Sequence, residues 1–185
     1  MRRARTRKTN HVKVVIVTGT PGTGKTTLAK RLAKALSFLY IDVKQVIKED
    51  QLQSGYDRKR KVIIVDETKL ARSISKRIRV ATRGMVIDSH LSQYLSPSLA
   101  DACLVTVCDL KTLARRLKKK GYAAAKIKEN IQAEIFDTCA QEARELGHEP
   151  IVVDTTDGTP LARVIRSLNR KGINKQEKIM KKKIV

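Results

Sequence analysis

Apolar residues along the chain fall into short runs separated by stretches of helical periodicity. Five runs predict buried strands: Val12 to Val17, Phe38 to Ile41, Met85 to Ile87, Ala102 to Val107 and Ile151 to Val153. Between them, three sets of apolar residues recur every three or four positions, as on one face of a helix: Leu70, Ile74, Ile78 and Ala81; Leu110, Leu113, Ala114 and Leu117; and Ile127, Ile131, Ile135, Cys139 and Leu146. The alternation predicts an α/β fold, a doubly wound parallel sheet of about five strands.

Two helix starts carry their own signals. Asp109 stands directly before the second periodic set, where an aspartate caps a helix by accepting a backbone N–H. Thr159 and Pro160 are expected to open a last helix, with the proline in its first turn.

A glycine-rich loop joins the first predicted strand to the first predicted helix. Residues 19–27 read Gly-Thr-Pro-Gly-Thr-Gly-Lys-Thr-Thr, the order that a phosphate-binding P-loop requires. We expect Gly22 and Gly24 to let backbone N–H groups face the phosphates, with Lys25 at the β/γ oxygens and Thr26 on a magnesium ion. Thr27 completes the predicted nucleotide-binding set. The chain is therefore predicted to bind a nucleoside triphosphate.

Besides Thr26, a carboxylate is expected to hold the magnesium ion, and the sequence offers two candidates. Val62 to Glu67 resembles the Walker B strand of motor ATPases, with Asp66 on the metal and Glu67 activating water, and AAA-type P-loops also read Pro-Gly-Thr-Gly-Lys-Thr. Only about 120 residues follow that segment, too few for the rest of such a core and its helical subdomain. Gly84 to His90 instead resembles the strand-end Asp88 of small nucleoside-phosphate kinases.

Further segments, in order, resemble the adenylate kinase 6 family, the atypical adenylate kinase and ATPase of small-subunit ribosome assembly. They are Tyr40 to Val43, Lys48 to Leu52, Gly55 to Asp57, Ile64 to Glu67, the Asp-x-His of Asp88 and His90, Arg116 to Tyr122, and Lys126 to Phe136. The resemblance covers residues 12–155. It implies a P-loop fold of the nucleoside-monophosphate-kinase type, with an acceptor flap over residues 42–65 and a lid over residues 119–129.

The resemblance also implies roles for single residues. Asp88 would hold magnesium, partly through water, His90 would orient the phosphate or the attacking group, and Arg116 would act with Lys120 over the phosphates. Asp66 and Glu67 would then only begin a helix. The implied reaction is transfer from ATP to AMP, giving two ADP, with ATP hydrolysis beside it.

The implied partners are a small-subunit ribosomal protein of the S-eleven family (S-fourteen in eukaryotes) and rRNA. A non-enzymatic, ATP-switched binding module stays open as another hypothesis. Lys48 and Lys120 stand where relatives commonly carry arginine. Lysine keeps the charge but lacks the bidentate fork that clamps a transferring phosphoryl group, so ATP binding and slow hydrolysis are more firmly implied than efficient transfer to AMP.

Charge changes the picture of the chain ends. The formal net charge is +22, and basic residues crowd the expected N-terminal arm 1–11 and C-terminal tail 173–185, on either side of one predicted domain, 12–172. Such segments favour RNA through counterion release, although a lysine-rich solvated surface has the same composition. The three cysteines lack metal-site or disulfide-framework spacing, and no run approaches a membrane span. A cytoplasmic protein is expected.

Overall fold

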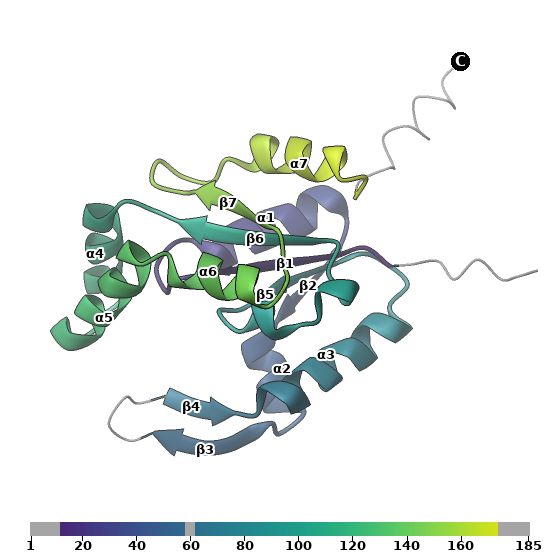
Figure 1. The fold of residues 1–185 in the computed structure, drawn as a ribbon, viewed down its shortest axis with the longest axis horizontal. Helices are drawn as coiled ribbons and strands as arrows, with labels where there is room; N and C mark the ends of the chain where they lie inside the picture. Colours follow the sequence, from purple (N-terminus) through teal and green to yellow (C-terminus); the bar gives the residue numbers. More distant parts are fainter. Residues whose placement is uncertain (1–11, 58–61, 174–185) are drawn as a thin grey trace, which may run out of the picture.

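Five parallel strands form the main sheet of the computed structural model, which describes residues 12–57 and 62–173 (Figure 1). The strand order is β2-β5-β1-β6-β7. The bounds are β1 Val14–Gly19, β2 Leu39–Asp42, β5 Met85–Asp88, β6 Ala102–Val107 and β7 Pro150–Asp154. The predicted doubly wound sheet is confirmed, and strand ends differ from the predicted ones by two residues or fewer.

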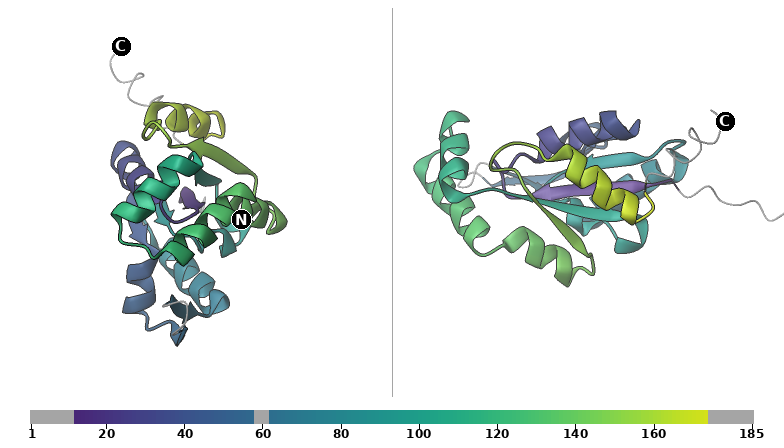
Figure 2. Two further views of the ribbon diagram at one scale, coloured as in Figure 1. Left: turned by 90° about the vertical axis from the view of Figure 1, so that its left-hand side faces the viewer. Right: turned by 90° about the horizontal axis from the view of Figure 1, so that it is seen from above.

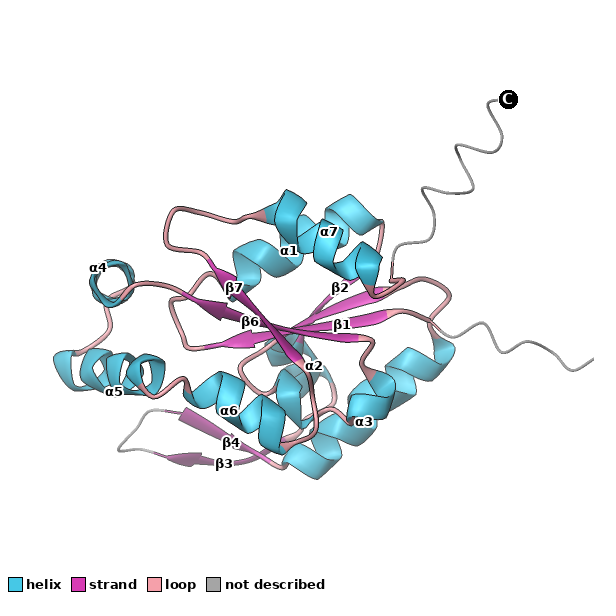
Figure 3. Cartoon of the chain, turned by 45° about the horizontal axis from the view of Figure 1, so that its top comes forward, coloured by secondary structure: helices cyan, strands magenta, loops and turns pink. Residues whose placement is uncertain are grey.

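Helices cover both faces of this sheet (Figure 3). One face packs against α1 (Lys25–Leu36) and α7 (Leu161–Arg170), and the other against α2 (Val43–Glu49), α3 (Glu67–Val80) and α6 (Thr138–Glu145). Successive strand residues point to opposite faces of the sheet. Val14 and Ile16 therefore pack against α2, α3 and α6, whereas Val15 and Val17 pack against α1 and α7.

Two further helices stand beyond the carboxyl ends of the strands (Figure 2). They are α4 (Leu110–Lys119) and α5 (Ala124–Ile135), and they share a small apolar cluster. Leu113 and Leu117 of α4 are fully buried there, against Ile127 and Ile131 of α5. The helices α4 and α5 follow β6 in the chain and therefore lie at the edge of the sheet where the P-loop opens.

A two-stranded antiparallel hairpin lies apart from the main sheet. It consists of β3 (Gln53–Asp57) and β4 (Val62–Val65), between α2 and α3. Two short 3-10 turns, Ser92–Tyr94 and Pro97–Leu99, connect β5 to β6.

The structure corrects the third predicted periodic set. The chain does not form one helix there, because Asp137 adopts a left-handed conformation (φ 50°) and divides α5 from α6. Ile135 is 57% exposed and Leu146 39% exposed, so neither supports a continuous buried stripe. The bend lets α6 pack on the sheet through Ala140 and Ala143.

Smaller predictions have mixed outcomes. Asp109 caps α4 by accepting the N–H of Thr112 at 2.9 Å, as predicted. Leu110, expected on the buried stripe of that helix, is 41% exposed. Pro160 precedes α7 as its N-cap and does not lie inside its first turn.

The arm 1–11 and nearly all of the tail 173–185 lie outside the described residues, and the limits of arm, domain, flap, lid and tail stay predictions. Cys103 and Cys108 are buried. Within residues 12–57 and 62–173, we find no helix with the length and apolarity needed to cross a membrane.

Candidate active site

The glycine loop curls between β1 and α1 as a P-loop does. Gly22 and Gly24 have φ of 97° and 95°, which residues with a side chain rarely adopt. A Cβ on Gly22 would lie 2.9 Å from Leu113 of α4. The loop is therefore closely packed against α4, and its backbone shape depends on both glycines.

Lys25 turns back over this loop. Its Nζ donates to the carbonyl oxygens of Gly19 at 2.7 Å and Thr20 at 2.9 Å. Burial lowers the pKa of Lys25 to about 8, against the opposing effects of Cys139 and Asp88. The ammonium group is thus held at the mouth of the loop, short of counter-charge, and a polyphosphate would supply that charge.

Thr26 and Thr27 follow Lys25 in the first turn of α1. Both are exposed, so their hydroxyl groups are accessible to a ligand. The free N–H groups and positive dipole end of a 12-residue helix face the same place. This end of α1 has the properties of an anion site.

Threonine hydroxyls anchor the loop from behind. Thr23 shares a hydrogen bond of 2.7 Å with Thr106 of β6 and donates to the Thr20 carbonyl at the same distance. Thr155, after β7, donates to the carbonyl of Thr23. The sequence interpretation missed Thr106 and Thr155. A threonine directly at or after a predicted strand end was the available signal.

Asp88 ends β5, the strand beside β1. It pairs with Val17 in the register of these strands and is only 6% exposed. Its Oδ2 accepts a hydrogen bond of 2.9 Å from the hydroxyl of Tyr40 on β2. Burial and this contact with Asp88 raise the pKa of Tyr40, which stays a donor. The sequence alone assigned no role to Tyr40, because the order of the strands is needed to place it beside Asp88.

His90 follows two residues after Asp88, on the surface of the site. Desolvation of the imidazole lowers its pKa, and three nearby cations, Lys25, Lys44 and Lys126, lower it further. These lysines belong to α1, α2 and α5, so His90 lies between the P-loop, the predicted flap and the predicted lid. The imidazole is therefore neutral at pH 7 and free to accept a proton.

Arg116 and Lys120 have different positions. The Arg116 guanidinium donates to the carbonyls of Thr155 at 2.7 Å and Thr156 at 3.2 Å, beside the P-loop. Lys120 is exposed at the end of α4 and is near enough to Lys25 to lower its pKa. Lys120 is therefore on the Lys25 side of the site, whereas Arg116 is hydrogen-bonded to the loop after β7.

Asp66 and Glu67 lie elsewhere. The strand before them, β4, pairs with β3 and with no strand of the main sheet as described. Asp66 caps α3 by accepting the N–H of Lys69 at 3.0 Å, and Glu67 is the first helical residue. The hypothesis that they end a Walker B strand of the main sheet is wrong, and the expectation that they begin a helix is confirmed.

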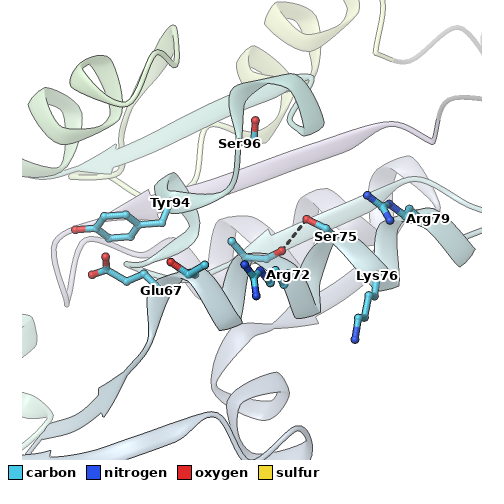
Figure 4. A pocket seen from close by; sticks show the side chains of 9 residues that line it. Glu67, Arg72, Ser75, Lys76, Arg79, Tyr94 and Ser96 are labelled. Carbon is cyan, nitrogen blue, oxygen red and sulfur yellow. Dashed lines mark hydrogen bonds between the residues drawn. The ribbon is translucent and has the colours of Figure 1, made fainter.

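A cavity of about 550 Å³ opens along α3, from its first residue, Glu67, to Arg79 near its end (Figure 4). Glu67 and Tyr94 lie together at one end of it, and Arg79 lies at the other. The cavity thus runs along α3, from the end that carries Glu67 to the end that carries Arg79.

The donor groups fit a magnesium–nucleotide complex. Among the described residues, no three His, Cys, Asp or Glu side chains gather as a metal site. Magnesium commonly takes only one or two carboxylates, with substrate phosphates and water completing its shell. One buried carboxylate, Asp88, and one exposed hydroxyl, Thr26, agree with that pattern.

A P-loop follows the first strand, a carboxylate ends the neighbouring strand, and the β3–β4 hairpin and the α4–α5 pair are two small additions to the main sheet. This arrangement is typical of P-loop kinases. Solved structures share this fold. A shikimate kinase from Acinetobacter baumannii, in complex with shikimate, matches with a TM-score of 0.58 at 15% identity, over 87% of this chain and 94% of that one. A putative kinase from Chloroflexus aurantiacus matches with a TM-score of 0.52 at 19% identity, over 86% and 95%.

Sequence relatives identify the family. Residues 15–137 match the family model described as an AAA domain. The chain is 39% identical over 138 residues to the adenylate kinase isoenzyme 6 homolog of Caenorhabditis elegans, covering 75% of this chain and 76% of that protein. It is 34% identical over 166 residues to a putative adenylate kinase of Thermococcus kodakarensis, covering 88% and 89%. The chain belongs to the adenylate kinase 6 family and is an adenylate-kinase-like P-loop enzyme.

Proposed function

We propose that this protein transfers the γ-phosphoryl group of ATP to AMP, and more slowly to water, with Mg²⁺ as its metal. The observation that carries the proposal is the meeting of Lys25, Asp88 and His90 at one edge of the sheet. Its relatives are named as adenylate kinases, which supports ATP as the donor and AMP as the acceptor.

The P-loop side would bind and orient the triphosphate. Backbone N–H groups of the loop and the start of α1 would surround the phosphates, and Lys25 would exchange its carbonyl partners for phosphate oxygens. Bound Mg²⁺ would neutralise the β- and γ-phosphate charge, held by Thr26 and, through water, by Asp88. Phosphoryl transfer consists mostly of such positioning and charge neutralisation.

The acceptor side would place the attacking oxygen. Lys44 and Lys48 project from α2 as exposed cations and would attract the phosphate of AMP. His90, neutral at pH 7, would accept a hydrogen bond or proton from the acceptor or from water. Lys120 would come over the transferring phosphoryl group as the lid closes. Arg116 would first have to leave the carbonyls of Thr155 and Thr156.

An apolar hairpin supports a second, coexisting function in ribosome assembly. Tyr56, Ile63 and Ile64 are 52%, 52% and 50% exposed on β3 and β4. A small charged acceptor such as AMP does not need so much exposed apolar surface, whereas a protein partner does. We propose that this surface contributes to binding a ribosomal protein of the S-eleven family. The basic ends would contact rRNA, in the cytoplasm where subunits are completed.

One coupled assay of ADP formation tests the enzyme. We expect ADP from ATP and Mg²⁺ alone at a slow rate, and a rate at least tenfold higher when AMP is added. The Lys25→Ala protein is the blank for contaminating kinases. Equal rates with and without AMP would leave an ATPase and remove the adenylate kinase.

Calorimetry of the purified pair tests the partner. We expect binding of the ribosomal protein, weakening with ATP and Mg²⁺ in the wild type but not in the His90→Ala or Lys25→Ala proteins, because a closing flap changes the hairpin surface. Brisk ADP formation from AMP together with no binding at tens of micromolar would leave a housekeeping kinase.

A further inference from the structure

The outer face of α3 carries a row of four cations. Lys69, Arg72, Lys76 and Arg79 recur at three- and four-residue spacing, so they lie on one side of the helix. The opposite side is the buried one, with Leu70, Ile74 and Ile78 in the core. The row follows the whole exposed length of α3 and spans about 15 Å at 1.5 Å per residue.

Two cavities flank this row. The first, of about 550 Å³, lies between α3 and the segment of the two 3-10 turns, and Arg72, Lys76 and Arg79 line it (Figure 4). The second, of about 520 Å³, lies on the α2 side and includes Asp50 and Lys69. Arg72 and Lys76 line both. The cations therefore edge two concave strips of surface, which a flexible chain can follow.

The charge of this face is not neutralised within the described structure. None of the four cations forms an ion pair with a residue in 12–57 or 62–173, whereas the adjacent Arg77 pairs with Glu49 and Asp50 at 3.0 and 2.8 Å. In the first cavity, the acidic residue is Glu67, at the end that also holds Tyr94. The remaining length is cationic, with the hydroxyl groups of Thr68 and Ser96 beside it.

We propose that this face of α3 binds the sugar–phosphate backbone of single-stranded RNA, with Tyr94 stacking on a base. Four cations in a row of about 15 Å present a line of positive charge to successive phosphates of one strand. Tyr94 is partly exposed at the end of the cavity, and an aromatic ring beside a cationic groove is a common platform for unpaired bases. An acidic protein segment could pair with the cations of α3, but it has no base to stack on the Tyr94 ring.

Further basic residues lie outside the described part of the chain. Arg2, Arg3, Arg5, Arg7 and Lys8 precede Val12 in the sequence. The proposal for α3 is independent of the kinase reaction and of any binding by the terminal segments alone.

A matched pair of triple variants tests the proposal in the full-length protein. Arg72→Gln/Lys76→Gln/Arg79→Gln removes three cations over eight residues of α3. Arg163→Gln/Arg166→Gln/Arg170→Gln removes three exposed cations over eight residues of α7, next to the basic tail. Fluorescence anisotropy with a single-stranded oligoribonucleotide of about 16 residues is followed at several salt concentrations. Melting temperatures check that both variants fold.

We expect the α3 triple variant to lose about two units from the slope of log affinity against log salt, at about 0.7 per phosphate contact, and up to about a hundredfold in affinity at 0.1 M salt. The α7 triple variant should keep the wild-type slope. Equal losses in both variants would show a general charge effect, and no loss in the α3 variant would assign binding to other segments. Either result overturns the proposal.

Tyr94→Leu separates RNA from other polyanions. Loss of one stacked base should weaken RNA binding about tenfold at an unchanged salt slope, and leave the binding of inorganic polyphosphate as it was. If polyphosphate or polyglutamate of equal charge binds as tightly as RNA, and Tyr94→Leu weakens none of them, the face is a general anion surface and the proposal fails.

Discussion

The P-loop side and the hairpin side of this enzyme are built very differently. On the first, β1, β5 and β6 are buried in the main sheet, and hydroxyl groups of Thr23, Thr106 and Thr155 fix the loop from behind. On the second, only two short strands pair with each other, and their apolar side chains are about half exposed. An isolated two-stranded ribbon is marginally stable in water.

This difference indicates how the work is divided. The donor site is formed in the protein as described, because a site that neutralises four charges must be preorganised to act on them. We propose that the acceptor site becomes complete only when the hairpin and the predicted lid approach His90. Changes on the P-loop side should therefore affect turnover most, and changes on the hairpin side should affect acceptor or partner binding.

Lys25→Ala should break the donor side most severely. Loss of the ammonium group removes charge neutralisation at the β/γ oxygens, and we expect turnover to fall about a hundredfold or more. The fold should survive, because Lys25 contacts backbone carbonyls at the mouth of the loop. An ADP assay beside circular dichroism checks both. Turnover retained with native spectra would refute the P-loop assignment.

Two carboxylate variants compare the regions directly. Asp88→Asn should lower the rate at saturating Mg²⁺ at least tenfold, since a buried charge beside the P-loop is lost. Glu67→Gln, at the exposed start of α3, should change the rate less than twofold, within the ~0.5 kcal/mol typical of surface substitutions. The opposite ranking would favour a water-activating role for Glu67.

The pH dependence of ATP binding follows from Lys25. With a pKa of about 8 in the free protein, Lys25 is charged below pH 8 and loses its charge above it. ATP prefers the charged form, so affinity should fall about tenfold between pH 7 and pH 9. Titration with a fluorescent ATP analogue measures the change. In Lys25→Arg, whose side chain stays charged, the dependence should disappear, and a flat profile in the wild type would contradict the buried-lysine explanation.

Tyr40→Phe should lower turnover less than Lys25→Ala or Asp88→Asn does. It removes the hydrogen bond that orients Asp88, of about 1 kcal/mol, and we expect about a fivefold loss with a higher Mg²⁺ requirement. Tyr56→Phe, on the exposed hairpin, is the matched control and should behave as the wild type. If both variants lose activity equally, the Asp88 contact is not the cause.

Sequence alone predicted the donor side better than the acceptor side. The strands, the glycine loop and the cap of α4 follow from local patterns, in which neighbouring residues are enough to identify the structure. The Asp88–Tyr40 contact required the strand order, because β2 and β5 are distant in sequence. The break at Asp137 also escaped, since apolar spacing continues through it and only a left-handed backbone at one residue ends α5.

The 62–65 segment was ambiguous for a related reason. An apolar run followed by Asp66 and Glu67 has the same local pattern as a strand of the main sheet, and only tertiary pairing with β3 removes it from that sheet. Likewise, the cations of α3 are visible in the sequence, but the two cavities beside them depend on how α3 packs against α2 and the 3-10 turns.

Hydrogen exchange tests the contrast between the two sides most directly. Without ligand, amides of β1 and β5 should exchange only through global unfolding, while those of β3 and β4 exchange at least a hundredfold faster. A non-hydrolysable ATP analogue should protect the P-loop and leave the hairpin unchanged, and a bisubstrate analogue that joins two adenosines through a polyphosphate should protect the hairpin as well. A hairpin that is as protected as β1 without ligand, and unchanged by the bisubstrate analogue, would contradict this account.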